Sequence, residues 1–263
     1  FLYFIFQKTS YSSNNFFLIV EIMIYCLPLV ICGFLDDIYE LHERTKFFTQ
    51  SLTAILLLKT INVIYFPFNN YINFFVLLIL LIFFIGNINM INFMDGIDGL
   101  IGGTFAFIFF ILALKLNLFF LPLSLGLVGF LFWNWSPAKI FLGDSGSTFL
   151  GAFYSAVILS SNSYKEGLSL FLLISPLFFD AIICFLRRLT IGANVFKAHK
   201  QHLYQRLVQN GLSHKLVSKI YISSIIFISI FYLFENLVLE LLAASLIFFM
   251  GVFLEKNYAI EFK

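Results

Sequence analysis

The chain has 263 residues, of which 61% are hydrophobic and only 11% are charged, with a net charge of +2. Its mean hydropathy of +0.97 excludes an ordinary soluble domain and indicates a membrane protein. The 38 phenylalanines accompany many Ile, Asn and Lys residues, a bias typical of AT-rich coding sequence, so they predict no stacking surface and no nucleic-acid partner. Cys26, Cys32 and Cys184 fall in apolar runs, where we expect packing rather than disulfides.

Nine apolar runs are long enough to cross a bilayer as helices, since a span needs roughly 20 residues. In chain order they cover residues 16–34, 47–65, 71–90, 99–115, 118–134, 147–163, 167–186, 217–234 and 237–254. The predicted fold is an all-α, polytopic transmembrane bundle with these nine complete spans. The opening residues 1–6, FLYFIF, lack an initiator Met and a basic leader, so we expect them to be the stub of an earlier helix. Residues 1–263 are therefore predicted to form a single, N-terminally truncated membrane domain.

The basic residues are distributed unevenly between the two predicted faces of the membrane. If the loop at 35–46 lies on side one, alternate loops place twelve Lys and Arg residues there and four on the other side. The positive-inside rule makes side one cytoplasmic. All six Asp and all four His also fall at or near this face, whereas the eight Glu divide evenly. If Asp residues were present only for solvation, they would be found on both faces, as the Glu residues are. The concentration of Asp and His on one face therefore predicts a site for metal and phosphate there.

The first candidate segment is GFLDDIYELHERTKFFTQ, at residues 33–50. Asp36 and Asp37 end one predicted helix, and Lys46 begins the next. Adjacent carboxylates repel each other, and at a helix C-terminus they also oppose the macrodipole. A solvated helix end is the plainer interpretation, but these costs favour a functional pair beside a cation.

The second segment, NINMINFMDGIDGL, follows an uncharged run at 74–85 and places four polar side chains at intervals of three. They are Asn89, Asn92, Asp95 and Asp98. On a continuous helix this spacing drifts by about 60° per step and would spread them over half the circumference. We expect Gly96 and Gly99 to loosen the helix end and let the oxygen atoms converge.

The third segment, SPAKIFLGDSGSTFLG at residues 136–151, contains a GDSGS that resembles the surroundings of a serine-protease nucleophile. That interpretation is rejected because such proteases need an all-β fold, whereas here a membrane helix follows. Asp144 is better interpreted as an oxygen ligand. Gly143 and Gly146 would let the backbone approach a phosphate at a helix N-terminus, which favours anions.

The fourth segment is the loop at 187–219, where His199 and His202 stand three apart in HKQHLYQRL. A His pair could bind zinc, but no Cys or second His pair completes a four-ligand site, and His214 alone is insufficient. Three basic residues accompany the pair: Lys197, Lys200 and Arg206. The histidines are therefore interpreted as part of a cluster that contacts phosphate.

Oxygen ligands facing basic residues suit a divalent cation and a diphosphate. Mg²⁺, or Mn²⁺ in its place, keeps several waters and takes one or two carboxylates plus substrate phosphates. Phosphoryl transfer needs positioning and charge neutralisation more than covalent machinery. A site at the cytoplasmic interface would meet a soluble nucleotide from one side and a lipid phosphate from the other.

The four segments, in this order and on one face, resemble those of the polyprenyl-phosphate N-acetylhexosamine-1-phosphate transferases, of the glycosyltransferase family 4 type, over residues 16–254. The resemblance implies transfer of a sugar-1-phosphate from a UDP-N-acetylhexosamine to undecaprenyl phosphate, with release of UMP, at the bacterial inner membrane. The product would start a cell-envelope polysaccharide. The loop HKQHLYQRLVQNGLSH is closer to the branch that starts O-antigen or other surface polysaccharides than to the phospho-N-acetylmuramoyl-pentapeptide branch, which carries consecutive histidines there.

The resemblance also assigns roles to individual residues. It implies that Asp36, the candidate base, and Asp37 lie by the lipid phosphate. Asn92 and Asp144 would hold Mg²⁺, and Asp144 would count among the catalytic residues. The remaining residues implied to bind substrate are Lys46, Asn89, Asp95, Asp98, His199, His202 and Arg206. A homodimer is left open.

The alternative function is a transporter or flippase of a lipid-linked sugar, in which charged groups inside the membrane mark a pathway. Such a pathway needs charges near mid-membrane in several helices, and only Asp180 comes close. Asp180 could pair structurally with Arg187, seven residues further on, or act in the site. Both interpretations of Asp180 remain open from the sequence.

Overall fold

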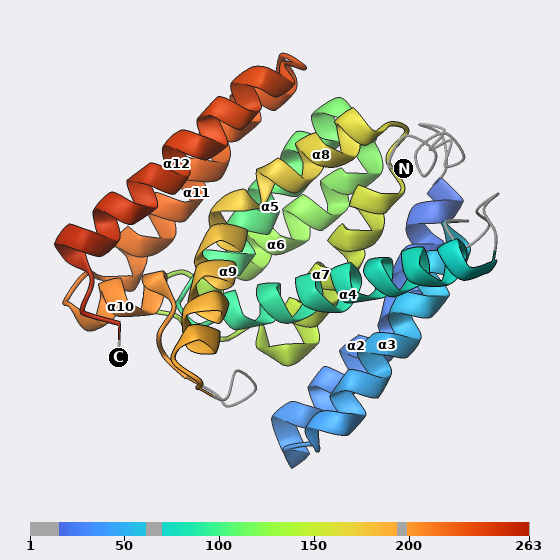
Figure 1. Ribbon diagram of the computed structural model, residues 1–263, viewed down its shortest axis with the longest axis horizontal. Coiled ribbons are helices and arrows are strands. Elements are labelled where there is room, and N and C mark those ends of the chain that lie inside the picture. The colour runs from blue at the N-terminus through green and yellow to red at the C-terminus, as the bar shows by residue number, and fades with distance from the viewer. Residues whose placement is uncertain (1–15, 62–69, 194–198, 263) are drawn as a thin grey trace. The chain divides into compact units, whose positions relative to one another are not determined.

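The structure is a computed structural model that describes residues 16–61, 70–193 and 199–262 (Figure 1). Throughout these ranges the regular elements are helices without a strand, so the all-α prediction is confirmed for the described residues. In chain order the helices are α2 (Phe16–Tyr39), α3 (Glu43–Thr60), α4 (Asn70–Met94), α5 (Leu100–Lys115), η1 (Leu118–Phe120), α6 (Leu121–Asn134), α7 (Gly143–Leu159), α8 (Tyr164–Leu173), α9 (Ser175–Thr190), α10 (Leu203–Gln209), α11 (His214–Leu233) and α12 (Leu237–Tyr258).

Each predicted apolar run coincides with a helix or with two consecutive helices in its described part. Four helical segments among the described residues are long and apolar enough to cross a membrane: Leu18–Tyr39, Asn73–Met94, His214–Leu233 and Leu237–Tyr258. The pair α8 and α9 raises this number to five if it forms one broken span. The predicted stub at 1–6 and the end of the second run, 62–65, lie outside the described residues.

The predicted run at 167–186 does not form one straight helix. The chain breaks between α8 and α9, which are bent by 74° relative to each other. Pro176 stands in the first turn of α9. Because proline lacks an N–H and its ring clashes with the preceding helical turn, it starts a helix readily but interrupts one.

The chain folds into two compact units, and one of them comprises Phe1–Asn92 and Leu142–Leu170. In this unit α2 packs against both α3 and α7, and Figure 1 shows α2 and α3 side by side. Ile22, Cys26 and Leu57 are fully buried in its core, and Cys26 is a free thiol, as predicted. Asp36 closes the turn after α2, because its Oδ1 accepts the Leu41 N–H at 2.7 Å.

The second unit comprises Phe93–Phe141 and Phe171–Lys263. Here α5 packs against α6 and α11, α11 pairs with α12, and α9 contacts α11 and α12. The short α10 contacts α9, α11 and α12 and thereby ties the end of the polar loop to the helices. The single membrane domain predicted for residues 1–263 stays a prediction.

Candidate active site

A close contact between two helices positions the first pair of predicted carboxylates. An added Cβ at Gly33 would lie 2.3 Å from the Ser145 amide nitrogen, so α2 and the start of α7 touch backbone to backbone. Asp36 and Asp37 follow Gly33 by three and four residues and therefore share its helix face. The contact brings this pair to the N-terminus of α7, where Asp144 lies in the first turn.

Asp36, Lys46 and Asp144 form one charged cluster in this unit. The Lys46 ammonium donates to Asp36 Oδ2 at 2.6 Å, and it lies 3.7 Å from Asp144 Oδ2. The side chain of Asp36 is 12% exposed and that of Asp144 is 29% exposed, so the cluster is sheltered yet open to a ligand. Two carboxylates beside a single ammonium leave one negative charge for a bound cation.

The pKa values express this imbalance. Burial raises the pKa of Asp144, Lys46 opposes the rise, and the neighbouring Asp36 carboxylate adds to it. Burial lowers the pKa of Lys46, but Asp36 and Asp144 together leave it raised above its ordinary value. Asp144 is therefore the group whose charged form gains most from an added cation.

The oxygen donors around Asp144 fit Mg²⁺. The Asn92 side chain hydrogen-bonds to Asp144 and lowers its pKa against the effect of burial. Gly143 adopts a left-handed φ of +66°, and an added Cβ there would lie 2.6 Å from Asp37 Oδ2. Carboxylate and amide oxygens of this kind are hard ligands that suit Mg²⁺. The cluster thus unites Asp36, Asp37 and Lys46 with the two predicted metal ligands.

Asn89 lies one helical turn before Asn92 but contacts α3. Its side chain exchanges two hydrogen bonds with Gln50, at 3.1 and 3.0 Å, and also donates to the Ile85 carbonyl at 2.9 Å. Gln50 is only 6% exposed. The structure therefore places Asn89 in an amide pair that joins α3 to α4, and its predicted contact with substrate stays a prediction.

Helix α4 ends at Met94, between the predicted asparagines and aspartates, and α5 begins after Gly99, whose φ is +73°. The helix is therefore interrupted in this segment, with a positive φ at Gly99, while the expected convergence of the four oxygen-bearing side chains stays a prediction. Asp98 belongs to the second unit, where its Oδ1 lies 3.2 Å from His214 Nδ1 and its Oδ2 accepts the Ala138 N–H at 3.2 Å. Asp98 thus joins the loop before α7 to the start of α11.

Asp95 is half-buried in the same turn and lies near Tyr204 of α10. The Tyr204 hydroxyl donates to the Phe93 carbonyl at 2.9 Å. An added Cβ at Gly96 would lie 2.1 Å from that hydroxyl oxygen. Burial raises the pKa of Tyr204, and the carboxylates of Asp180 and Asp95 raise it further, so the phenol stays protonated and keeps this hydrogen bond.

Asp180 is a buried acceptor for three donors. Its Oδ1 accepts the Leu203 N–H at 2.6 Å, while its Oδ2 accepts the Tyr204 N–H at 3.0 Å and the Tyr221 hydroxyl at 2.6 Å. The suggested structural pair with Arg187 is wrong, because Arg187 instead forms a two-point contact with Glu255 of α12. Arg187 follows Asp180 by about two turns on α9. Asp180 contacts α10 and α11, whereas Arg187 contacts α12.

Arg206 is 5% exposed, and its Nε, Nη1 and Nη2 atoms all donate hydrogen bonds. It donates to Glu255, to the Ile260 carbonyl at 2.9 Å and to the Gln201 carbonyl at 3.2 Å. These contacts hold the C-terminal segment against α10. The predicted substrate contact of Arg206 stays a prediction.

His199 and His202 lie together, with their rings stacked at a centroid distance of 5.1 Å. Burial lowers the pKa of His202, but Asp180 and Cys184 together outweigh burial and raise it to about 9, with Asp180 Oδ1 3.6 Å from His202 Nδ1. Burial, His202 and Arg188 lower the pKa of His199 to about 4. At neutral pH the pair therefore has one cationic and one neutral ring. Lys200 is exposed, and Lys197 lies outside the described residues.

Sequence reasoning missed three residues that hold these groups in place. Gln50 and Tyr221 lie within apolar runs, where their polar atoms gave no pattern, and Glu255 was counted only as a cytoplasmic charge. The sequence could only have indicated that Asp180 and Arg206, if buried, need partners of the kind that Tyr221 and Glu255 supply. Which residue supplies the partner depends on how distant helices pack, and the sequence alone does not show this.

Comparison with known proteins gives the class of this chain. A profile described as Glycosyl transferase family 4 matches residues 19–162, which is more than half of the chain. The chain therefore belongs to glycosyl transferase family 4. The match contains the cluster of Asp36, Lys46 and Asp144 and ends before the loop that carries His199.

Individual relatives carry more specific names. The chain is 40% identical over 120 residues to the probable undecaprenyl-phosphate N-acetylglucosaminyl 1-phosphate transferase of Bacillus subtilis, covering 41% of this chain and 33% of that protein. It is 32% identical over 201 residues to the undecaprenyl-phosphate alpha-N-acetylglucosaminyl 1-phosphate transferase of Thermotoga maritima, covering 74% and 63%. It is also 42% identical over 87 residues to the phospho-N-acetylmuramoyl-pentapeptide-transferase of Pseudarthrobacter chlorophenolicus, covering 32% and 23%. The chain thus spans less than two thirds of the length of each of these relatives.

Proposed function

We propose that this protein transfers an N-acetylhexosamine-1-phosphate from a UDP-sugar to undecaprenyl phosphate and releases UMP. The cluster of Asp36, Lys46 and Asp144 is the observation that carries the proposal, because it joins carboxylates and an ammonium at a helix N-terminus. Membership of glycosyl transferase family 4 supports it. So do relatives named for transfer of N-acetylglucosaminyl 1-phosphate to undecaprenyl phosphate.

The proposed reaction exchanges one phosphoanhydride for another. An oxygen of the lipid phosphate attacks the β-phosphorus of the UDP-sugar, and the bond from that phosphorus to the bridging oxygen breaks. UMP leaves with the electron pair, and the sugar phosphate becomes joined to the lipid phosphate. Mg²⁺ held by Asn92 and Asp144 would supply neutralisation of the phosphate charges during this exchange.

The residues of the first unit take distinct roles in this proposal. Asp36 accepts the remaining proton of a monoprotonated lipid phosphate, and Asp37 lies beside that phosphate. Lys46 orients Asp36 through its 2.6 Å hydrogen bond and contacts the diphosphate. The ammonium also offsets part of the repulsion between anionic groups that must approach each other.

Residues of the second unit and Asn89 would bind the UDP-sugar. Asp95 and Asp98 serve the metal and the uridine end, and Asn89 contributes to substrate binding. The cationic ring of His202 and its partner His199 bind the diphosphate. Arg206 contributes positive charge near that loop.

The proposed setting is the bacterial inner membrane, crossed by nine helical spans with the site at the cytoplasmic face. The twelve-to-four distribution of basic residues supports this orientation. We place the chain in the branch that starts O-antigen or another surface polysaccharide, because its final loop lacks a run of histidines. Mg²⁺ is the proposed cofactor, with Mn²⁺ as a substitute, and a homodimer is compatible with the proposal.

A transfer assay tests the proposal directly. Membranes that contain the protein are incubated with UDP-GlcNAc labelled in the sugar, with undecaprenyl phosphate and with Mg²⁺. We expect labelled lipid and UMP in equal amounts, and neither product when undecaprenyl phosphate is omitted. Release of free labelled sugar phosphate without labelled lipid, or no reaction with any UDP-N-acetylhexosamine, would refute the proposed transfer.

A further inference from the structure

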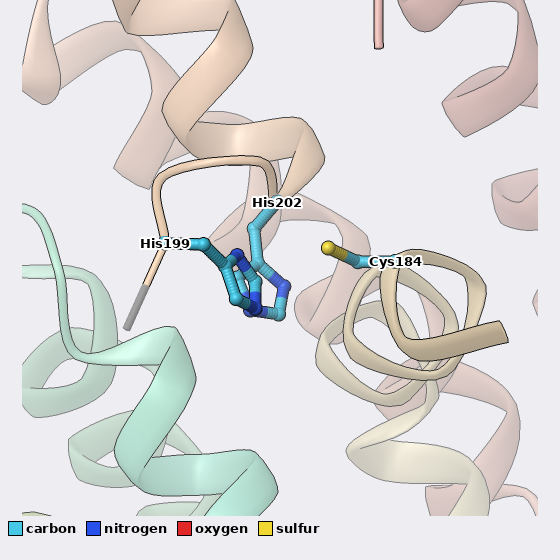
Figure 2. Close-up of side chains that lie close together, drawn as sticks. All are labelled: Cys184, His199 and His202. Carbon is cyan, nitrogen blue, oxygen red and sulfur yellow. The ribbon is translucent and has the colours of Figure 1, made fainter. Parts of the chain in front are cut away.

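The second unit contains a cluster of metal-ligating side chains that the proposed reaction does not use as a whole. Cys184 of α9 points toward His199 and His202 of the following loop, as Figure 2 shows. One ligand atom from each residue lies within 4.8 Å of the other two. Cys184 is 3% exposed and is a free thiol. We propose that Cys184, His199 and His202 bind a thiophilic divalent cation such as Zn²⁺.

The available nitrogen atoms support this assignment. Nδ1 of His202 is buried and has no hydrogen-bond partner among the described residues. His202 as a whole is 3% exposed, so water does not easily satisfy that atom. Nδ1 of His199 accepts the Gln201 N–H at 3.4 Å, which leaves Nε2 as the nitrogen for a metal. This nitrogen faces Asp180 Oδ1 at 3.6 Å, which is longer than a hydrogen bond, so a cation between these rings and the thiol would replace that contact as its partner.

The one sulfur and two nitrogen ligand atoms favour Zn²⁺ over Mg²⁺. One thiolate and two imidazoles are the ligands of zinc sites that keep a fourth position for water, whereas Mg²⁺ prefers oxygen. Ligand atoms around one Zn²⁺ would be about 3.5 Å apart. The separations of up to 4.8 Å therefore require a rearrangement of about 1 Å, which the half-buried His199 in its loop can supply.

The surrounding charges are compatible with a divalent cation. Asp180 Oδ1 lies 3.6 Å from His202 Nδ1 and adds a negative charge beside the thiolate. Arg188, which lowers the pKa of His199, adds a positive charge near that ring and donates to Gln201 at 2.5 Å. Zn²⁺ binding would release the thiol proton of Cys184 and the proton of His202 to solvent, and the thiolate and the Asp180 carboxylate would offset the charge of the metal.

Cys184 borders a cavity that neither histidine lines. A cavity of ≈ 60 Å³ between α9, α11 and α12 is lined by Cys184, Asp180 and Gln201. It belongs entirely to the second unit. The zinc site is therefore distinct in ligand chemistry from the oxygen donors around Asp144. Its occupancy would withdraw His199 and His202 from the diphosphate, a consequence that rests on the proposed function.

Cobalt binding tests the site without any measurement of transfer. The purified protein in detergent is stripped with a chelator and titrated with Co²⁺, whose bond to a thiolate gives a charge-transfer band in the near ultraviolet. We expect one thiolate-bound Co²⁺ per chain, displaced by Zn²⁺ but not by Mg²⁺. Absence of this band from the wild-type protein would overturn the proposal, whether or not the transfer assay succeeds.

Two variants and a matched control identify the ligands. Cys184→Ala should abolish the band, while Cys26→Ala, which removes another buried thiol, should leave it intact. His199→Ala keeps the thiol, changes only a half-buried loop residue and should weaken Co²⁺ binding by at least about tenfold. Persistence of the band in Cys184→Ala, or wild-type affinity in His199→Ala, would show that the metal binds elsewhere.

Discussion

Gly33 of α2 lies so close to the start of α7 that an added Cβ would be 2.3 Å from the Ser145 amide nitrogen. Gly33→Ala should therefore push the two helices apart. Because the obstructing atoms belong to the backbone, we expect a loss of about 1–3 kcal/mol in the free energy of unfolding. Transfer should fall by at least about tenfold, since small misplacements of catalytic groups are costly.

Gly86→Ala is the matched control for that change. Gly86 also lies within a helix of the first unit, but an added Cβ there would meet nothing within 4 Å. Alanine should be neutral or should stabilise the helix by up to about 1 kcal/mol. Thermal unfolding in detergent and the initial transfer rate provide the comparison, and equal effects of the two substitutions would exclude helix contact as the cause.

The amide pair between Gln50 and Asn89 should be measurable as a coupling. Replacing either residue by Leu leaves the other amide without its partner, whereas the double replacement removes both polar groups. We expect the two single losses to exceed the loss in the double variant, with a coupling of about 1 kcal/mol in the membrane. A double-mutant cycle on unfolding free energies measures it, and strictly additive losses would mean that the pair contributes no stability.

Asp180→Asn should reduce stability more than it reduces the transfer rate. Asparagine has one acceptor oxygen where Asp180 receives three hydrogen bonds, two of them from backbone N–H groups. The expected loss is about 3 kcal/mol, compared with about 1 kcal/mol for Tyr221→Phe, which removes a single donor. Protein level and thermal unfolding provide the readouts. A stable Asp180→Asn variant without activity would instead show that Asp180 acts in transfer, either directly or by keeping His202 cationic.

Membrane orientation can be tested with reporter fusions. The distribution of basic residues predicts that fusions after residues 40, 92, 140 and 200 all report the cytoplasm. An enzymatic reporter that is active on one side of the membrane only gives the answer, with a fusion after Lys115 as the control for the opposite side. A periplasmic signal after residue 140 together with a cytoplasmic signal after residue 200 would contradict both the span number and the shared face.

Sequence pattern was sufficient for the positions of the helices and for the residues around Asp144. Apolar runs identify helices because lipid-facing and buried positions are both apolar, and Asp36 and Lys46 stood at the ends of such runs. Pro176 could have indicated the helix break between α8 and α9, but the run is apolar on both sides of it and was therefore predicted as one helix. Apolar runs of similar length also formed helices of different length, because α5 has 16 residues and α12 has 22.

Contacts between distant segments could not be read from the sequence. The two histidines of the loop appeared to lack a thiol, because Cys184 belongs to an apolar run in which a cysteine is the ordinary packing residue. Only the fold of the second unit brings the thiol to the rings. Likewise, the suggested partner of Asp180 was wrong because hydrogen bonding to α10 and α11 depends on how these helices pack.

The initial transfer rate of Asp144→Asn, measured against Mg²⁺ concentration in native-like membranes, tests the central claim most directly. Asparagine keeps the shape of the side chain and removes the charge that would anchor the cation, so the rate should fall about 10²-fold or more. Asn92→Ala should act on the same ion, so the double variant should lose much less than the product of the single losses. Glu43→Gln, which neutralises an exposed carboxylate at the start of α3, should remain near the wild-type rate. Near wild-type turnover of Asp144→Asn at limiting Mg²⁺ would contradict the assignment of this cluster as the catalytic centre.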